Sequence, residues 1–250
     1  PPAERGAGRL PNTHARGFGP LLTRAAKGGG ALSTIPHSRP QITPDDVRAV
    51  AEVVASGRLA TGEQVSLFEE ELARSVGAAG GVATASGTAA LHLALLALEI
   101  GPGDEVILPA WVCASVRSAV DYTGATPVIV DVDPATGNIS AAAARRALSR
   151  RTRAVIAAHM AGLPADMDVL AALGVQIIED CAQALGAAWK GRPVGSTGIL
   201  SVFSFYATKN LTCGDGGALA VRDAALAARL PSLRNHGITK DAASRYGQAY

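Results

Sequence analysis

Short apolar runs alternate with helical patterns along most of the chain beyond residue 80. The apolar runs predict strands at residues 82–85, 105–109, 126–131, 154–158, 175–178 and 201–206. The segments between them predict helices at residues 89–98, 115–122, 141–148 and 167–173. Strands and helices that alternate in this way form a mostly parallel sheet with helices on both faces. The pattern therefore predicts an α/β fold with three layers in the order αβα.

Two amphipathic helices are predicted ahead of this alternation. The first begins at Thr43-Pro44-Asp45-Asp46, which combines a Thr N-cap, a Pro at the first helical position and acids in the first turn, and it ends at Gly57. The second covers residues 65–76 and stops at a glycine. Residues 1–35 are rich in Gly, Pro and Arg and offer little to bury, which predicts a disordered tail. We therefore expect residues 36–250 to form the folded domain.

Composition narrows the classes of protein that fit this pattern. The chain has 250 residues, 48% of them apolar, which suits one large domain or a domain and a half. The 23 Lys plus Arg nearly balance the 21 Asp plus Glu, so the net charge of +2 gives no reason to expect a nucleic-acid or membrane partner. No apolar run reaches the roughly 18 residues of a membrane span, and no signal peptide is recognisable. Cys113, Cys181 and Cys213 lack metal-binding spacing, so we expect no metal and a cytoplasmic protein with reduced thiols.

Several polar groups fall at the carboxyl ends of the predicted strands, where parallel sheets bind ligands. Lys209 follows the last strand and precedes a glycine-rich turn. It is either a surface lysine on that turn or a desolvated amine that condenses with an aldehyde as a Schiff base. Asp180 follows the strand 175–178 and is either a cap or salt-bridge group or the partner of a protonated heterocyclic nitrogen. Ser86-Gly87-Thr88 opens a helix, either as an ordinary N-cap or as a phosphate site.

Taken together, these groups meet the requirements of pyridoxal 5'-phosphate (PLP). Lys209 would carry the Schiff base, and Asp180 would hold the pyridine nitrogen protonated. Ser86-Gly87-Thr88 and Ser204 would cradle the phosphate. A protonated pyridine is an electron sink for a carbanion, and the freed lysine can move a proton between the two reacting carbons. That combination is the chemistry of transamination.

Seven stretches share their order and spacing with a known family. They are residues 86–95 (SGTAALHLAL), 101–107 (GPGDEVI), 124–128 (GATPV), 164–168 (PADMD), 179–184 (EDCAQA), 204–210 (SFYATKN) and 233–237 (LRNHG). On these stretches the chain, from about residue 35 to 237, resembles the DegT/DnrJ/EryC1/StrS family of PLP-dependent sugar aminotransferases.

The resemblance implies the large domain of a fold-type I PLP-dependent transferase, in a homodimer with active sites at the subunit interface. It also implies transfer of an amino group from glutamate or glutamine to a keto-sugar nucleotide or related cyclic ketone, as in polysaccharide or antibiotic biosynthesis. Lys209 falls on the Schiff-base lysine and Asp180 on the pyridinium partner. Residues 59–61 fall on a loop near the substrate. The remaining implied cofactor contacts are Gly87, Thr88, Ala89, Cys113, Gln183 and Ser204.

The chain departs from the family pattern in two places. After Pro109-Ala110 the family usually has two aromatic residues separated by one, and the second stacks on the cofactor ring. Here Trp111 takes the first place and Cys113 the second, which leaves a small sulfur contact unless Trp111 tilts in. Family members also continue into a smaller C-terminal domain with a Gly-aromatic-Asn-x-Arg motif. That motif is missing here, so we expect the small domain to be absent and the chain to be a fragment or to be completed by another chain.

Two other functions and two other side chains need weighing. A non-catalytic scaffold or regulatory partner with the same fold is one alternative, although the intact set of site residues argues against it. A PLP-dependent sugar dehydratase is the other, but that branch replaces the lysine with histidine, so Lys209 argues against it. His159 follows the strand 154–158, and we expect a structural role for it. Glu179 is expected to be a sheet-end or salt-bridge group.

Overall fold

The computed structural model describes residues 36–238, of which residues 37 onward belong to one compact unit. The predicted tail at residues 1–35 lies outside the described residues. The helices are α1 (Pro44–Ala55), α2 (Glu63–Val76), α3 (Gly87–Ala97), α4 (Ala114–Thr123), α5 (Ala141–Ala147), η1 (Met160–Gly162), α6 (Met167–Ala171) and α7 (Ala224–Arg234). The strands are β1 (Gly80–Thr84), β2 (Glu105–Pro109), β3 (Thr126–Val130), β4 (Thr152–Ala158), β5 (Gln176–Asp180), β6 (Ala188–Trp189), β7 (Arg192–Pro193), β8 (Leu200–Ser204) and β9 (Gly217–Val221).

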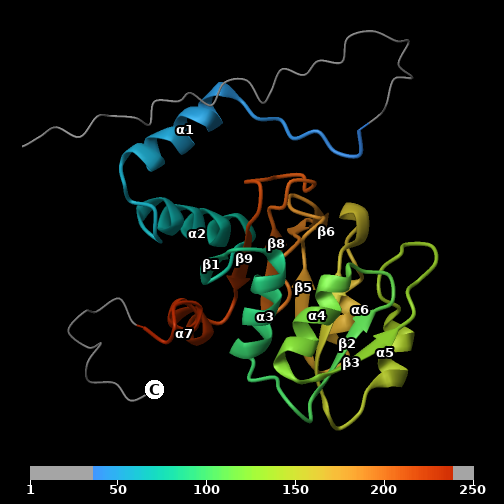
Figure 1. The fold of residues 1–250 in the computed structure, drawn as a ribbon. Coiled ribbons are helices and arrows are strands. Elements are labelled where there is room, and N and C mark those ends of the chain that lie inside the picture. Colours follow the sequence, from blue (N-terminus) through green and yellow to red (C-terminus); the bar gives the residue numbers. More distant parts are fainter. Residues whose placement is uncertain (1–35, 239–250) are drawn as a thin grey trace, which may run out of the picture. The chain divides into compact units, whose positions relative to one another are not determined.

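The main sheet has seven strands in the order β1-β9-β8-β5-β4-β2-β3 (Figure 1). The pairs β2–β3, β2–β4, β4–β5 and β5–β8 are parallel. β9 runs antiparallel to both of its neighbours, β1 and β8. The prediction of a mostly parallel sheet is therefore confirmed, with one strand reversed.

Helices cover both faces of this sheet, which confirms the three layers. On β8, Val202 packs into a core with α3, α4 and Leu230 of α7. The next residue, Phe203, points to the opposite face and packs with Leu72 and Val76 of α2. On β4, Val155 and Ala157 likewise face the core that contains α5 and α6. Successive residues of a strand point to opposite faces, so each buried strand contributes to both cores.

The last strand and the last helix of the described chain were not predicted from the sequence. The expected elements stop at the strand 201–206, whereas the structure continues through β9 and α7. All five residues of β9 are buried, and its apolar run Ala218-Leu219-Ala220-Val221 is the signal that could have found it. The β6–β7 hairpin was missed as well, because two strands of two residues carry too short a pattern to detect.

The first helix begins at its predicted cap and the second ends at its predicted glycine, although α1 already ends at Ala55 and α2 begins at Glu63, two residues before the predicted start. Thr43 and Asp46 form a reciprocal capping box at the start of α1. α2 ends at Gly77, whose φ of 66° is left-handed and therefore favours glycine. None of the residues Pro44–Ala55 is buried, in contrast to α2, which buries three. Within residues 36–238, no helix has both the length and the apolar character needed to cross a membrane.

Candidate active site

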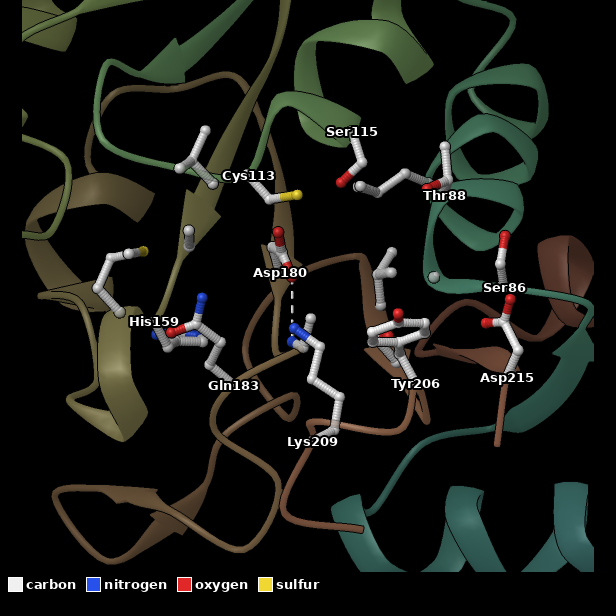
Figure 2. Close-up of a pocket in the computed structure, with 18 residues that line it drawn as sticks. Ser86, Thr88, Cys113, Ser115, His159, Asp180, Gln183, Tyr206, Lys209 and Asp215 are labelled. Atoms are coloured by element: carbon white, nitrogen blue, oxygen red, sulfur yellow. Dashed lines mark hydrogen bonds between the residues drawn. The ribbon is translucent and has the colours of Figure 1, made fainter. Parts of the chain in front are cut away.

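A cavity of ≈ 380 Å³ opens at one edge of the sheet, where β1, β2, β4, β5 and β8 end and β9 begins (Figure 2). Its volume lies within the roughly 300–1,000 Å³ typical of small-molecule sites. The residues that line it are Ser86, Gly87, Thr88, Leu91, Val112, Cys113, Ser115, Ala158, His159, Met160, Asp180, Ala182, Gln183, Val202, Ser204, Tyr206, Lys209 and Asp215. The fold thus brings together segments that are more than 100 residues apart in the sequence.

The turn before α3 has the geometry of an anion site. Ser86 is the N-cap of this helix, and its Oγ accepts a hydrogen bond from the N–H of Ala89 at 3.2 Å. The first N–H groups of a helix have no intrahelical partner, so those of Gly87 and Thr88 stay available to a ligand. Ser204, at the end of β8, adds a hydroxyl to the same wall. This end of the cavity therefore fits a phosphate.

Two glycines let the turn lie directly against the sheet. A Cβ on Gly87 would lie 2.9 Å from the Cβ of Ser204. A Cβ on Gly217, the first residue of β9, would lie 2.3 Å from the carbonyl carbon of Ser86. No ordinary side chain fits at either distance. The close approach of β8 and β9 therefore sets the position of the anion site.

Asp180 is the last residue of β5, which extends two residues beyond the strand end that the sequence predicted. Its side chain points into the cavity (Figure 2), and one carboxylate oxygen accepts a hydrogen bond from the N–H of Ala182 at 3.0 Å. The residue is 7% exposed, and this burial raises the pKa of Asp180 more than the Ala182 hydrogen bond and the charge of Lys209 lower it. A cationic ring nitrogen in the cavity would stabilise the ionised carboxylate.

Lys209 reaches into the cavity from the loop between β8 and β9 (Figure 2). Its backbone N–H donates to the carbonyl of Tyr206 at 2.9 Å. The base of this loop is closed by the N–H of Phe205, which donates to Gly216 at 2.9 Å. Asn210 ties the loop to the β5 side through a hydrogen bond to the carbonyl of Leu185 at 2.7 Å. The backbone around the half-buried lysine is therefore anchored on both sides, and the lysine is not a free surface residue.

Cys113 lies on the wall opposite Lys209, and its sulfur points into the cavity (Figure 2). Hydrogen bonds from the hydroxyl and the backbone N–H of Ser115 lower the pKa of the Cys113 thiol, against the opposing effect of partial burial. Trp111 is 66% exposed and lies outside the cavity lining, so it does not replace the missing aromatic face. A sulfur atom therefore occupies the place where the family pattern has a ring.

Gln183 lines the cavity between β5 and the segment that follows β4. Its side-chain oxygen accepts a hydrogen bond from the N–H of Ala161 at 2.9 Å. Because the oxygen is engaged in this way, the amide nitrogen is left to point into the cavity (Figure 2). Gln183 thus presents a hydrogen-bond donor to a ligand.

His159 and Glu179 form a buried pair beside the cavity. The N–H of Ala165 donates to Nδ1 of His159 at 2.9 Å, so the ring proton is on Nε2, which donates to Glu179 at 3.1 Å. Burial raises the pKa of Glu179, but hydrogen bonds from His159 and from the N–H groups of Gly198 and Gly195 outweigh it and leave the pKa lowered. Glu179 has the sheet-end position expected from the sequence, whereas His159 makes structural hydrogen bonds and also lines the cavity.

Cys181 completes a trio with this pair, in which potential metal-ligand atoms lie within 4.8 Å of one another. Both oxygens of Glu179 already accept hydrogen bonds, from Gly195 and His159 on one side and from Thr197 and Gly198 on the other. Burial also raises the pKa of the Cys181 thiol well above its ordinary value. The trio is therefore explained as a hydrogen-bonded part of the core.

Two sequence predictions lie away from this cavity. Ala89 borders a different recess, lined also by Thr61 and Arg234, and its N–H is engaged by Ser86. Residues 59–61 lie between α1 and α2, and none of them lines the cavity. Their roles stay predictions.

Three polar residues of the lining were not singled out in the sequence. Ser115, Tyr206 and Asp215 all line the cavity. Tyr206 and Asp215 flank Lys209 in a short loop, and Ser115 is in the first turn of the helix after Cys113. Proximity in sequence to the predicted residues is the signal that could have found them.

Comparison with known proteins places the chain in a family. The sequence matches the DegT/DnrJ/EryC1/StrS aminotransferase family over residues 40–250. An aminotransferase from Psychrobacter cryohalolentis is 38% identical with a TM-score of 0.78, over 84% of this chain and 55% of its own. DesV from S. venezuelae, solved in complex with a ketimine intermediate, is 43% identical with a TM-score of 0.75, over 78% of this chain and 54% of its own.

A third solved structure bears on the cofactor. Spr1654 from Streptococcus pneumoniae, assigned as a sugar aminotransferase, is 32% identical in its apo form, with a TM-score of 0.80, over 83% of this chain and 58% of its own. Structures of the same protein exist in PLP and PMP forms. The present chain thus spans little more than half the length of these proteins, with shares of 55%, 54% and 58%.

The sheet and the structural neighbours define the class, which is the α/β fold of the fold-type I PLP-dependent aminotransferases. The chain belongs to the DegT/DnrJ/EryC1/StrS aminotransferase family, whose cofactor is PLP.

Proposed function

We propose that this chain binds PLP in the cavity and transfers an amino group from glutamate or glutamine to a keto-sugar nucleotide or related cyclic ketone. The observation that carries the proposal is the arrangement of three groups around one cavity. Lys209, Asp180 and the anion site before α3 face the same cavity from β8, β5 and α3. Each group meets a different requirement of the cofactor, namely its aldehyde, its ring nitrogen and its phosphate.

The residues present fit this cofactor at both ends. The free N–H groups of Gly87 and Thr88 and the hydroxyl of Ser204 would hold the phosphate. Asp180 would hold the ring nitrogen protonated, because a buried carboxylate of raised pKa gains most from a cationic partner. Cys113 would contact one side of the ring through sulfur, and Gln183 would donate a hydrogen bond from its amide nitrogen.

The reactive step is assigned to Lys209. When bound, PLP supplies an electron sink that stabilises negative charge on the carbon next to the substrate nitrogen. Lys209 Nζ would hold the cofactor covalently until an amino substrate displaces it, and would then move the proton between the reacting carbons. The anchored loop fixes the backbone of Lys209, whose side chain lines the same cavity as Asp180.

The test is to incubate the purified chain with PLP, reduce it with borohydride and locate the modified residue by mass spectrometry. We expect the label on Lys209. A Lys209→Ala variant should lose the label, whereas a Lys190→Ala variant should keep it, because Lys190 is exposed and pairs with Asp168 at 2.6 Å outside the cavity. An unchanged label in Lys209→Ala would overturn the assignment.

Mixing the loaded protein with amino donors then separates an enzyme from a scaffold. We expect glutamate or glutamine to convert the cofactor to its amine form, with loss of the visible absorption of bound PLP. A protein that binds PLP at Lys209 but reacts with neither donor would favour the non-catalytic alternative. Conversion by one donor but not the other identifies the donor.

We also infer that the protein acts as a homodimer in the cytoplasm. The support for the dimer is the family resemblance, and the support for the cytoplasm is the sparse, widely spaced set of three cysteines. Sedimentation of the purified protein, with and without PLP, would measure the subunit number. A monomer under both conditions would contradict the dimer.

A further inference from the structure

The segment Met160–Ala165 links β4 to α6 and borders the cavity at its Gln183 side. It begins with the short helix η1, in which Ala161 has a φ of 52°. This left-handed conformation is uncommon for a residue with a Cβ and persists only where surrounding contacts hold it. A bent backbone of this kind directs the N–H of Ala161 toward the side chain of Gln183.

Two buried side chains hold the segment in place. Asn138, between β3 and α5, is 5% exposed, although it lies outside the cavity lining. Its Oδ1 accepts from the N–H of Met160 at 2.9 Å, and its Nδ2 donates to the carbonyl of Leu163 at 3.0 Å. Asn138 therefore clamps the backbone on both sides of Ala161. His159 holds the far end through the N–H of Ala165.

The clamped segment in turn orients Gln183. An amide side chain can turn its oxygen or its nitrogen toward a neighbour, and only the oxygen can accept a hydrogen bond. Because the N–H of Ala161 donates to Gln183 at 2.9 Å, the amide nitrogen is the end that faces the cavity. Without this donor the amide would be free to turn its oxygen inward.

We propose that Asn138 is a positioning residue for the cofactor site, acting through residues 160–163 to hold Gln183 with its N–H donor in the cavity. The proposal rests on the proposed function, since it assumes that the donor meets bound PLP. Asn138 itself touches neither the cavity nor its ligand. A purely structural role would stabilise the turn between β3 and α5 and have no specific link to Gln183.

The first experiment needs no cofactor. Hydrogen exchange of the Ala161 amide is measured by NMR in the wild type and in an Asn138→Ala variant of the whole chain. We expect exchange to be faster by about tenfold or more, because the clamp beside this amide is lost. The matched control is Thr136→Ala, since Thr136 Oγ1 accepts from the N–H of Asn138 in the same turn at 3.2 Å but does not reach the segment. Equal exchange rates in Asn138→Ala and the control would overturn the link.

The second experiment is a double-mutant cycle on the dissociation constant for PLP. Asn138→Ala and Gln183→Ala should each weaken binding by roughly three- to tenfold, the effect of one lost hydrogen bond. The double variant should bind no more weakly than Gln183→Ala alone, because Asn138 acts through that side chain. Additive losses would contradict the proposal and indicate general destabilisation. An Asn138→Asp variant keeps the acceptor for Met160 and should recover part of the affinity.

The two experiments also separate this proposal from the proposed function. If the wild type fails to bind PLP, the proposed function is wrong, and Asn138 then has no cofactor site to position. The exchange measurement still decides whether Asn138 controls the Ala161 amide. If the wild type binds PLP and the cycle is additive, the function stands and the positioning role is wrong.

Discussion

Glu179 and Asp180 are adjacent carboxylates on β5, and the two faces of the sheet give them opposite surroundings. Glu179 points to the face of α2, α5 and α6, where its oxygens accept hydrogen bonds from three backbone N–H groups and from His159. Asp180 points to the face of α3 and α4, where its carboxylate accepts a hydrogen bond from the N–H of Ala182 and lines the cavity. The pKa of Glu179 is lowered and that of Asp180 is raised.

The number of hydrogen-bond partners that the protein supplies indicates which of the two carboxylates is available to a ligand. Both side chains are buried, and burial alone disfavours a charge. The protein satisfies Glu179 internally, so its charge contributes to the fold. It leaves Asp180 with an incomplete set of partners, and the free energy that this costs would be recovered on binding of a cation in the cavity.

The largest effect should come from removing the charge at Asp180. We expect Asp180→Asn to slow the half-reaction with the amino donor by about a thousandfold, because the group that stabilises the protonated ring is lost. Stopped-flow absorbance with the loaded protein measures this rate. Asp168→Asn is the matched control, since Asp168 is an exposed partner of Lys190 and Arg192. If the rate of Asp180→Asn stays within tenfold of the wild-type rate, the Asp180 charge contributes little to the reaction. The two carboxylates would then differ less in function than in their surroundings.

The next largest effect should appear in stability. We expect Glu179→Gln to lower the free energy of unfolding by about 3 kcal/mol, because an amide nitrogen would then face backbone N–H groups that need an acceptor. Urea unfolding measures the change. Glu71→Gln removes an exposed carboxylate paired with Arg74 and should change stability by less than about 0.5 kcal/mol. Equal losses of unfolding free energy in Glu179→Gln and Glu71→Gln would contradict the structural role given to Glu179.

The pH dependence of stability should have opposite signs for the two carboxylates. The lowered pKa of Glu179 means that its contribution is present above the ordinary value of 4.5 and is lost as the pH falls through the folded-state pKa. The raised pKa of Asp180 means that its ionised form opposes folding at neutral pH, and this penalty disappears as the pH falls toward the ordinary value of 3.8. In the cofactor-free protein, Asp180→Asn should therefore be at least as stable as the wild type at pH 7.

Unfolding of the two variants and the wild type from pH 7 down to well below pH 4 checks this sign, because the contribution of Glu179 is lost only below its ordinary pKa of 4.5. The stability deficit of Glu179→Gln should shrink on acidification, and any advantage of Asp180→Asn should shrink as well. A deficit of Glu179→Gln that grows toward low pH would contradict the lowered pKa.

The smallest effect is expected at Cys113, on the opposite wall of the cavity. A Cys113→Phe variant should bind PLP about three- to tenfold more tightly, because an aromatic face adds stacking that sulfur does not provide. Fluorescence titration with PLP measures the constant. Cys113→Ser keeps the small size and should stay within about twofold of the wild type. Weaker binding by the Phe variant would show that the cavity is shaped for the smaller side chain.

Much of the site could be predicted from the sequence because its parts are local. Lys209, the Ser86-Gly87-Thr88 turn and Asp180 each follow a predicted strand, and the end of a parallel strand is where such groups gather. Capping signals at Thr43 and Ser86 are also local, since an N-cap is defined within four residues. The family resemblance added the roles of Gln183 and Cys113, which spacing alone does not reveal.

Other parts could not be predicted, because they depend on contacts between distant segments. The reversed strand β9 pairs with β1, and residues 80 and 221 that face each other there are far apart in the sequence. Asn138 meets Met160, and Gln183 meets Ala161, for the same reason. Sequence patterns report which side chains are buried, but hydrogen bonds across such separations follow from the packing of whole elements.

For this protein, the sequence by itself determined the α/β class and the order of the main strands and helices up to residue 206, and it singled out the lysine, the carboxylate and the helix-opening turn that line one cavity. Those features rest on local periodicity, caps and spacing, which need no knowledge of the fold. Only the tertiary structure decided that Trp111 faces outward while Cys113 lines the cavity, and that Glu179 is satisfied while Asp180 is not. The physical reason is that adjacent residues of a strand point to opposite faces, and only the packed sheet determines what each face meets.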